Sequence, residues 1–168
     1  YDEHNNELYR HDLVHSWYYD SNEDIIWYDN ENEYDAAGNL VKVIRRNEAG
    51  EIERVSEHVY DKLGNRVKTT NYSADGKVKS TNEREYNKYG SMTKSVNYNA
   101  EGKVSSRTER EYDGNGHMTR DAQYDGLGTL LYEETFELDE NGNAAKETSY
   151  DGETSWSAEY AYTFIPLK

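Results

Sequence analysis

The chain has 168 residues, a formal net charge of −15 at pH 7 and no cysteine. Its length fits one domain or a short repeat array, and the lack of cysteine excludes disulfides and thiolate metal sites. No apolar run approaches the roughly 18 residues of a membrane-spanning helix, so we expect no membrane insertion. The acidic balance disfavours nucleic acid and anionic membranes as partners.

The core is expected to be thin. Ile, Leu, Val and Phe together make up roughly 15% of the sequence, a share typical of disordered chains when the net charge is large. The 17 Tyr and 3 Trp oppose that interpretation, because they are large amphipathic side chains that disordered segments mostly lack. We therefore predict a single folded domain. The chain begins at Tyr1 and not at Met, so we expect a mature or trimmed form from which any signal peptide or anchor is missing.

Residues 1–33 differ in sequence from the rest of the chain. Two aromatic stretches, residues 9–19 and 25–28, contain no Gly or Pro and predict two strands. The segment also contains two of the three Trp and many carboxylates. We interpret it as a degenerate aromatic cap at the N-terminal end of the fold.

Two sets of N-terminal side chains invite a metal-site hypothesis. The first set is a His cluster beside a carboxylate: His4, His11, His15 and Asp12. On a strand, His11 and His15 share one face but would lie about 13 Å apart, too far to bind one ion. The second set is Asp20, Asn22, Asp24 and Glu31. These residues match positions 1, 3, 5 and 12 of a calcium-binding loop, but Ile25 stands at the position where such a loop has Gly. We expect cap histidines and turn capping instead, and no cofactor.

Residues 34–154 contain a strict internal repeat. A shorter and a longer interval alternate without exception between successive glycines, at positions 38, 50, 64, 76, 90, 102, 116, 128 and 142. The true period is the sum of the two intervals, about 26 residues, a size that indicates stacked supersecondary units. One such unit contains two turns and two short spans, which fits a β-hairpin. The spans are too short for the unit to be a strand followed by a helix.

The clearest copy of the repeat is Tyr60-Asp61-Lys62-Leu63-Gly64-Asn65. Asp61 is expected to accept hydrogen bonds from the backbone that follows and to start a type I turn. Gly64 is expected to adopt a positive φ and close the hairpin. The predicted fold is therefore all-β: an antiparallel meander of these β-hairpin repeats in one curled or spiral sheet. A closed up-and-down barrel is the alternative.

The last segment, residues 155–168, alternates aromatic and polar side chains up to Pro166. It is predicted as a C-terminal capping strand, since repeat arrays need special units at exposed ends.

Alternation along each strand, counted from its glycine, predicts a basic face with tyrosine at its margins and an acidic opposite face. Arg pairs with anionic groups and tyrosine rings stack on sugars, so the basic face is a candidate site for an anionic glycan or cell-wall polymer. Sheet packing and solvation are the plainer interpretation of the same residues. The candidate ligand-binding residues are Arg54, Arg84, Arg110, Arg120, Tyr86, Tyr98 and Tyr112.

The phrases Tyr34-Asp35-Ala36-Ala37-Gly38-Asn39, Tyr60-Asp61-Lys62-Leu63-Gly64-Asn65 and Leu138-Asp139-Glu140-Asn141-Gly142-Asn143 resemble the YD repeats of bacterial Rhs and wall-associated proteins, toxin-complex shells and animal teneurins. The resemblance covers residues 34–154. It implies a long sheet of β-hairpins, which in large members spirals into a hollow shell around a toxin, and it implies an exported or surface-exposed protein.

The near equivalence of the repeats predicts a protein without a catalytic site, because an enzyme would break that symmetry at one place. No sequence context for a nucleophile elbow is present. We expect a non-enzymatic structural or interaction module of an exported bacterial surface protein, with a glycan or another surface protein as partner. Anionic glycan binding is one alternative function, and a metal-dependent enzyme at the N-terminal His cluster is another.

Overall fold

The structure is a computed structural model that describes the backbone of residues 9–19 and 25–162 and the side chains of residues 28–162. In sheet order each strand follows its predecessor in the chain, without crossovers. The twelve strands are β1 (Tyr9–Tyr19), β2 (Ile25–Asp35), β3 (Leu40–Asn47), β4 (Ile52–Tyr60), β5 (Arg66–Ser73), β6 (Val78–Tyr86), β7 (Met92–Tyr98), β8 (Val104–Tyr112), β9 (Met118–Asp125), β10 (Leu130–Leu138), β11 (Ala144–Tyr150) and β12 (Ser155–Glu159).

The predicted all-β antiparallel meander is confirmed. Strand order runs from β1 at one end to β12 at the other, so the paired strands form an open sheet and not the alternative closed barrel. Within the ranges that the structure describes there is no helix.

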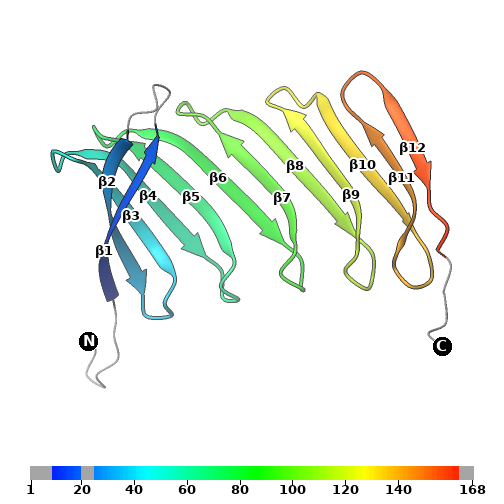
Figure 1. Ribbon diagram of the computed structural model, residues 1–168, viewed down its shortest axis with the longest axis horizontal. Helices are drawn as coiled ribbons and strands as arrows, with labels where there is room; N and C mark the ends of the chain where they lie inside the picture. The colour runs from blue at the N-terminus through cyan, green and yellow to red at the C-terminus, as the bar shows by residue number, and fades with distance from the viewer. Residues whose placement is uncertain (1–8, 20–24, 163–168) are drawn as a thin grey trace. The chain divides into compact units, whose positions relative to one another are not determined.

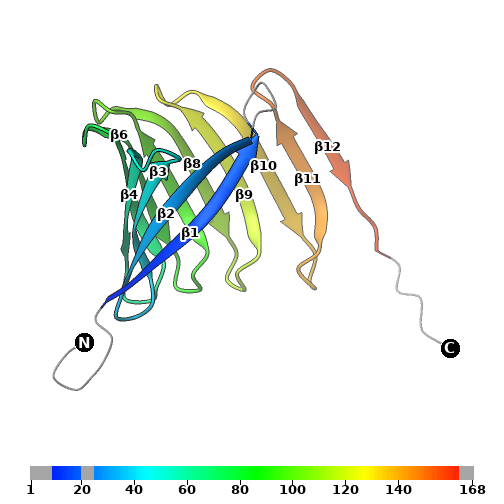
Figure 2. The same cartoon turned by 60° about the vertical axis from the view of Figure 1, so that its left-hand side comes forward.

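The chain divides into two compact units. Unit 1 consists of residues 1–83 and 98–103, and unit 2 of residues 84–97 and 104–168. In unit 1, β1 to β5 pair in succession, each antiparallel to the next (Figure 1). In unit 2, β8 to β12 pair in the same way, and they are drawn as neighbouring ribbons from green to red (Figure 2).

The predicted turn mechanism is confirmed at residues 61–65. Gly64 has a φ of +82°, and its N–H donates to the Asp61 carbonyl at 3.2 Å. Asp61 Oδ1 accepts the backbone N–H of Leu63 at 2.8 Å and of Asn65 at 2.9 Å. Asp61 Oδ2 accepts the side-chain amide of Asn65 at 2.9 Å. One carboxylate therefore satisfies three donors of an exposed turn, and the same N–H contacts recur at Asp35, Asp113, Asp125 and Asp139.

We expect Gly64→Val to destabilise the protein by about 2 kcal/mol, because a β-branched residue is strained at positive φ. The strain is conformational, since a Cβ at Gly64 would meet only Asn39 Oδ1, at 4.0 Å. Asp61→Ala should cost less, because water replaces the lost acceptor at this exposed position. Urea unfolding of both variants, with Lys62→Ala as control, measures the difference. Equal losses for Gly64→Val and Asp61→Ala would contradict this assignment of roles in the turn.

The core is as thin as the composition predicts. Among the described side chains no large one is fully buried, and the buried apolar residue is Ala122, at 0% exposure. The remaining buried residues are small or polar: Ser56, Ser95, Asp121 and Ser149. Hydrogen bonds and ion pairs between strands therefore carry much of the specificity that a hydrophobic core usually provides.

A β-bulge next to the turns that join β2 to β6 and β8 to β11 changes the faces that the sequence predicts. Val59 lies opposite Lys68, whereas the next residue, Tyr60, lies opposite Arg66, so Val67 is an extra residue on β5. An extra residue reverses the alternation beyond it. The same shift occurs between β2 and β3 and between β8 and β9. The sequence-based pattern assigns alternate residues of the short strands β3, β5 and β9 to the same face as alternate residues of the long strands β4 and β8. The bulges place these two sets of residues on opposite faces, so that assignment is wrong.

The cross-strand pair predicted at the turn itself is confirmed. Tyr112 lies opposite Met118, and the equivalent pair at the other type of turn, Tyr72 opposite Val78, forms in unit 1. These pairs precede the point at which the bulge displaces the register.

Candidate functional site

Basic and acidic side chains share one face of unit 1. Lys68 Nζ lies 2.9 Å from Glu83 Oε1, and Lys42 Nζ lies 4.0 Å from Glu33 Oε1. The hydrogen bond and charge of Glu83 raise the pKa of Lys68, and the hydrogen bond from Lys68 lowers the pKa of Glu83. The sequence predicts separate basic and acidic faces, and this prediction is wrong because the bulges bring Lys from short strands beside Glu from long strands. We call this surface the mixed-charge face.

Arg120 is the centre of the equivalent face in unit 2. Its Nε donates to Glu133 at 2.7 Å, one Nη donates to Glu111 at 3.2 Å and the other donates to the Tyr124 hydroxyl at 2.8 Å. The hydrogen bond with Tyr124 is the largest cause that raises the Arg120 pKa, and burial opposes it. The guanidinium thus links β8, β9 and β10 with three hydrogen bonds.

The opposite face carries short polar side chains in hydrogen-bonded rows, and we call it the small-polar face. In unit 1, the Ser56 hydroxyl donates to Asn71 Oδ1 at 2.8 Å, and Asn71 Nδ2 donates to Ser80 at 3.0 Å. In unit 2, Arg110 Nε donates to Asp121 Oδ2 at 2.8 Å. These side chains are therefore hydrogen-bonded to one another within the sheet.

Of the four predicted glycan-binding arginines, the structure places Arg120 on the mixed-charge face and the other three on the small-polar face of their units. Arg110 on β8 lies opposite Asp121 on β9. The neighbouring residues of these two strands, Glu111 and Arg120, lie opposite each other on the other face of the sheet. Both guanidinium groups have a carboxylate partner. Arg54 lies opposite Ser73 on the small-polar face of unit 1. Alternation along β6 places Arg84 on the face away from Glu83.

The three predicted tyrosines also divide between surfaces. The Tyr98 hydroxyl donates to Glu83 at 3.4 Å on the mixed-charge face of unit 1. The Tyr112 hydroxyl donates to the Met92 carbonyl at 2.9 Å, as Tyr60 does to the Leu40 carbonyl at 2.9 Å. Tyr86 ends β6 on the same face of that strand as Arg84. Of the seven predicted residues, Arg110 and Tyr112 line a common groove.

The N-terminal metal hypotheses fall largely outside the described side chains, which begin at residue 28. His4, His11, His15 and Asp12 lie there, as do Asp20, Asn22 and Asp24, and they remain predictions. Glu31, the remaining member of the proposed calcium set, pairs with Arg46 at 2.9 Å. Across the side chains of residues 28–162, no three His, Asp or Glu residues are grouped as metal ligands would be.

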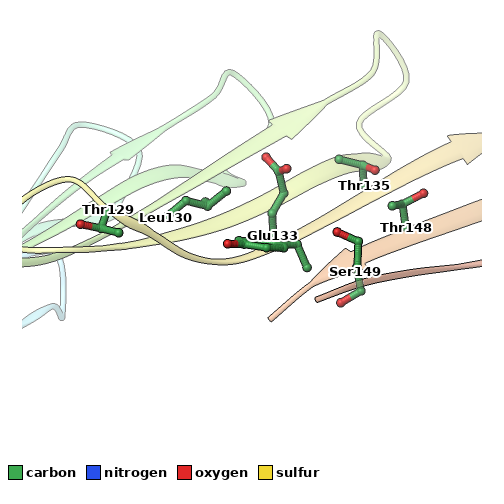
Figure 3. A pocket seen from close by; sticks show the side chains of 8 residues that line it. Thr129, Leu130, Glu133, Thr135, Thr148 and Ser149 are labelled. Carbon is green, nitrogen blue, oxygen red and sulfur yellow. The ribbon is translucent and has the colours of Figure 1, made fainter. Parts of the chain in front are cut away.

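A shallow concavity of about 470 Å³ lies on unit 2 between β10, β11 and β12 (Figure 3). Hydroxyl groups dominate its lining, with Thr135 and Thr148 on neighbouring strands. The one carboxylate that lines it, Glu133, accepts from Arg120 at 2.7 Å. The concavity therefore offers hydroxyl groups and an already paired charge.

Two further grooves occupy equivalent positions in the repeat, one in each unit. In unit 1 a groove of about 640 Å³ lies between turns 35–38 and 61–64. In unit 2 a groove of about 630 Å³ lies between turns 87–90 and 113–116. The second groove contains Lys88 and Tyr89, which the sequence-based prediction does not include. The signal is present in the sequence: position 89 is aromatic where the equivalent turn residues are Ala37, Leu63, Asn115 and Asn141.

Acid should destabilise the turns. Hydrogen bonds from the turn lower the pKa of seven aspartates: Asp35, Asp61, Asp75, Asp113, Asp125, Asp139 and Asp151. A carboxyl with a lowered folded-state pKa stabilises the fold above its unfolded pKa of about 3.9. That stability is lost as pH falls through the folded-state value. Thermal unfolding followed by circular dichroism should show a melting temperature that declines below about pH 4.

A matched variant separates this effect from other carboxyl groups. Asn87 already occupies the turn-aspartate position, and its Oδ1 accepts the N–H of Tyr89 at 2.9 Å and of Ser91 at 3.0 Å. Replacing the six aspartates at the first turn position, all of the seven except Asp75, by Asn should therefore keep the turns and weaken the acid dependence. An unchanged decline in that variant would assign the acid sensitivity to the glutamates of the mixed-charge face.

Comparison with known proteins shows similarity only at the level of solved structures. No family model and no curated protein matches the chain. A crystal structure of TcdB2-TccC3-Cdc42 has 14% identity and a TM-score of 0.26, over 82% of this chain and 10% of that chain. The Photorhabdus luminescens Tc holotoxin pore has 15% identity and a TM-score of 0.26, over 79% and 10%.

A porin-like protein from Bacteroides uniformis has 12% identity and a TM-score of 0.38, over 86% of this chain and 92% of that chain. This chain spans about a tenth of the length of the toxin-complex chains that it matches. The structure neighbours thus include toxin-complex chains and a bacterial porin-like protein. In the described part of the chain, no helix has the length and apolar character needed to cross a membrane.

Proposed function

We propose that this chain is a non-enzymatic structural or interaction module of an exported bacterial surface protein, similar in repeat design to YD-repeat proteins. The observation that carries the proposal is the reuse of the same contacts in successive hairpins. The Asp turn, the tyrosine hydroxyl bound to a carbonyl 20 residues earlier, and the Lys or Arg paired with Glu each recur in phase.

These repeated contacts support a role in display more than in chemistry. The Asp contacts close each turn, and the tyrosine and ion-pair contacts join neighbouring strands, so the sheet is stabilised step by step along the array. The charged groups that would bind or activate a substrate are in large part paired with one another across strands. A scaffold of this type presents regular polar faces on each unit to a partner.

The proposal is tested in intact bacteria that carry an epitope-tagged copy of the protein's full-length gene. We expect added protease to remove the tagged chain from intact cells, while a cytoplasmic marker protein stays whole. Retention of the tagged chain in the cytoplasmic fraction would contradict export. Screening of the purified chain against pools of ester, glycoside, peptide and phosphoester substrates checks the second part of the proposal. Turnover that one point substitution abolishes would contradict the non-enzymatic assignment.

A further inference from the structure

We propose that the groove of unit 2 between turns 87–90 and 113–116 binds a neutral hexopyranose unit of a polysaccharide, with the ring of Tyr89 as the stacking surface. The groove has a volume of about 630 Å³, and Lys88, Thr93, Arg110 and Tyr112 also line it. The inference assumes the proposed role as an interaction module and assigns that role a ligand class and a site.

Tyr89 is exposed and at the same time fixed in place. It is 55% exposed, although tyrosine rings of this chain are commonly covered by neighbouring strands. Its hydroxyl donates to the Gly114 carbonyl at 3.0 Å, so the side chain bridges two successive turns. Its Cδ2 atom lies 3.8 Å from the position that a Cβ on Gly116 would occupy. A ring held at both ends loses little conformational freedom on binding, which favours its use as a contact surface.

Polar side chains line the same groove as the Tyr89 ring. Lys88 Nζ lies over one face of the Tyr89 ring, 4.8 Å from its centroid. A sugar that stacks on that face displaces this flexible side chain to the edge of the ring, where it can donate to a hydroxyl. The Thr93 hydroxyl and the Arg110 guanidinium line the same groove. Arg110 Nε is held by Asp121 at 2.8 Å, which fixes the guanidinium in one orientation. A pyranose has the matching chemistry, with an apolar CH face and hydroxyl groups at its edge.

The charges of the groove favour a neutral sugar. Arg110 is paired with Asp121 at 2.8 Å, and the carboxylate of Asp113 lines the groove together with Lys88. The whole chain carries a net charge of −15, so an anionic ligand approaches against a repulsive field. This assignment differs from the anionic glycan that the sequence suggested, and it adds Tyr89 and Lys88 to the predicted Arg110 and Tyr112.

The groove of unit 1 provides an internal comparison. At the positions equivalent to Lys88, Tyr89 and Arg110, unit 1 has Ala36, Ala37 and His58. The two grooves share their position between successive turns and the tyrosine hydroxyl bound to a backbone carbonyl. They are nearly equal in volume, about 640 Å³ in unit 1 and about 630 Å³ in unit 2, but the unit 1 groove lacks the exposed ring. We therefore assign the site to unit 2 alone.

Isothermal titration of the purified chain with cellotetraose, maltotetraose, mannotetraose and chitotetraose tests the site, with tetragalacturonate as the anionic comparison. We expect saturable binding of at least one neutral tetrasaccharide, weakened about tenfold or more by Tyr89→Ala, a change of about 1.4 kcal/mol. Tyr89→Trp should preserve binding. Leu63→Ala, at the same turn position in unit 1, should leave it unchanged.

Circular dichroism of each variant confirms that the sheet is intact. Absence of binding by all four neutral probes, equal binding by Tyr89→Ala, or tighter binding of tetragalacturonate would overturn the proposal. These outcomes are independent of export, because they are measured on the purified chain. Failure of the protease experiment in cells would instead contradict the proposed surface role.

Discussion

Gly126→Ala should lower the free energy of unfolding by about 3 kcal/mol, at the upper end of the usual range for overpacking. A Cβ at Gly126 would clash with the Val104 carbonyl oxygen and would lie 3.3 Å from the Ser105 Cα. Both atoms belong to the backbone of β8, so relief of the clash requires movement of a strand and not of a flexible side chain. Urea unfolding monitored by tryptophan fluorescence and circular dichroism measures the loss.

Gly114→Ala is the matched control for Gly126→Ala. Gly114 and Gly126 occupy the same position after the turn aspartate, Asp113 and Asp125 respectively, and neither has a positive φ. A Cβ at Gly114 meets no atom within 4 Å. Gly114→Ala should therefore be neutral or stabilise the protein by about 0.5 kcal/mol, through the unfolded state.

Repeat sequence alone makes the opposite prediction for Gly126. The equivalent residues in the two preceding repeats are Ala74 and Ala100, so a consensus argument expects Gly126→Ala to stabilise the fold. A stability of Gly126→Ala equal to that of Gly114→Ala would support the consensus argument and contradict the close approach of the turn to β8.

Local features of this fold could be predicted because they depend on adjacent residues. The turn at Asp61 to Asn65 needs an acceptor at its first position and a residue tolerant of positive φ at its fourth. Both requirements are visible in the sequence, and the hydrogen bonds confirm them. The fixed repeat period then requires that successive turns lie at opposite ends of successive strands, and the meander follows.

The faces of the sheet could not be predicted from the same pattern. A single extra residue, such as Val67 beside Tyr60, reverses the alternation of a strand, and nothing in its side chain marks it as a bulge. This one geometric feature places Arg120 with Glu111 and Glu133 and away from Arg110. A candidate site that depends on a shared face is therefore harder to predict than a turn.

Tyr89 illustrates a different limit of prediction from sequence. The repeat pattern makes tyrosine a marker of strand ends, whereas Tyr89 lies within a turn. The ring matters because its hydroxyl reaches the next turn, 25 residues later, and this contact depends on the spacing of turns in three dimensions. Departures from the common residue at equivalent repeat positions are therefore a better guide to a binding site than the residues that the repeats share.

Arg120→Met should destabilise unit 2 by about 2 kcal/mol, the usual order for the loss of hydrogen bonds to a charged group. Arg120 is 23% exposed and donates to acceptors on three strands: Glu111 on β8, Tyr124 on β9 and Glu133 on β10. Charge-assisted hydrogen bonds of this kind are stronger than neutral ones, and removal of the shared donor leaves Glu133 without a counter-charge. The methionine stem keeps most of the packing, so the loss measured by urea unfolding reports the hydrogen bonds and the charge.

Lys94→Met, one repeat earlier at the equivalent position, is the matched control for Arg120→Met. Lys94 Nζ lies 3.5 Å from Glu85 in a pair with 38% and 69% side-chain exposure, and exposed pairs of this kind contribute about 0–1 kcal/mol. Its loss should be small and should vanish in about 1 M salt, whereas the loss at Arg120 should persist in part, because partly buried pairs are screened less. Equal effects of the two variants would show that the three-strand arrangement around Arg120 adds nothing to an ordinary surface ion pair.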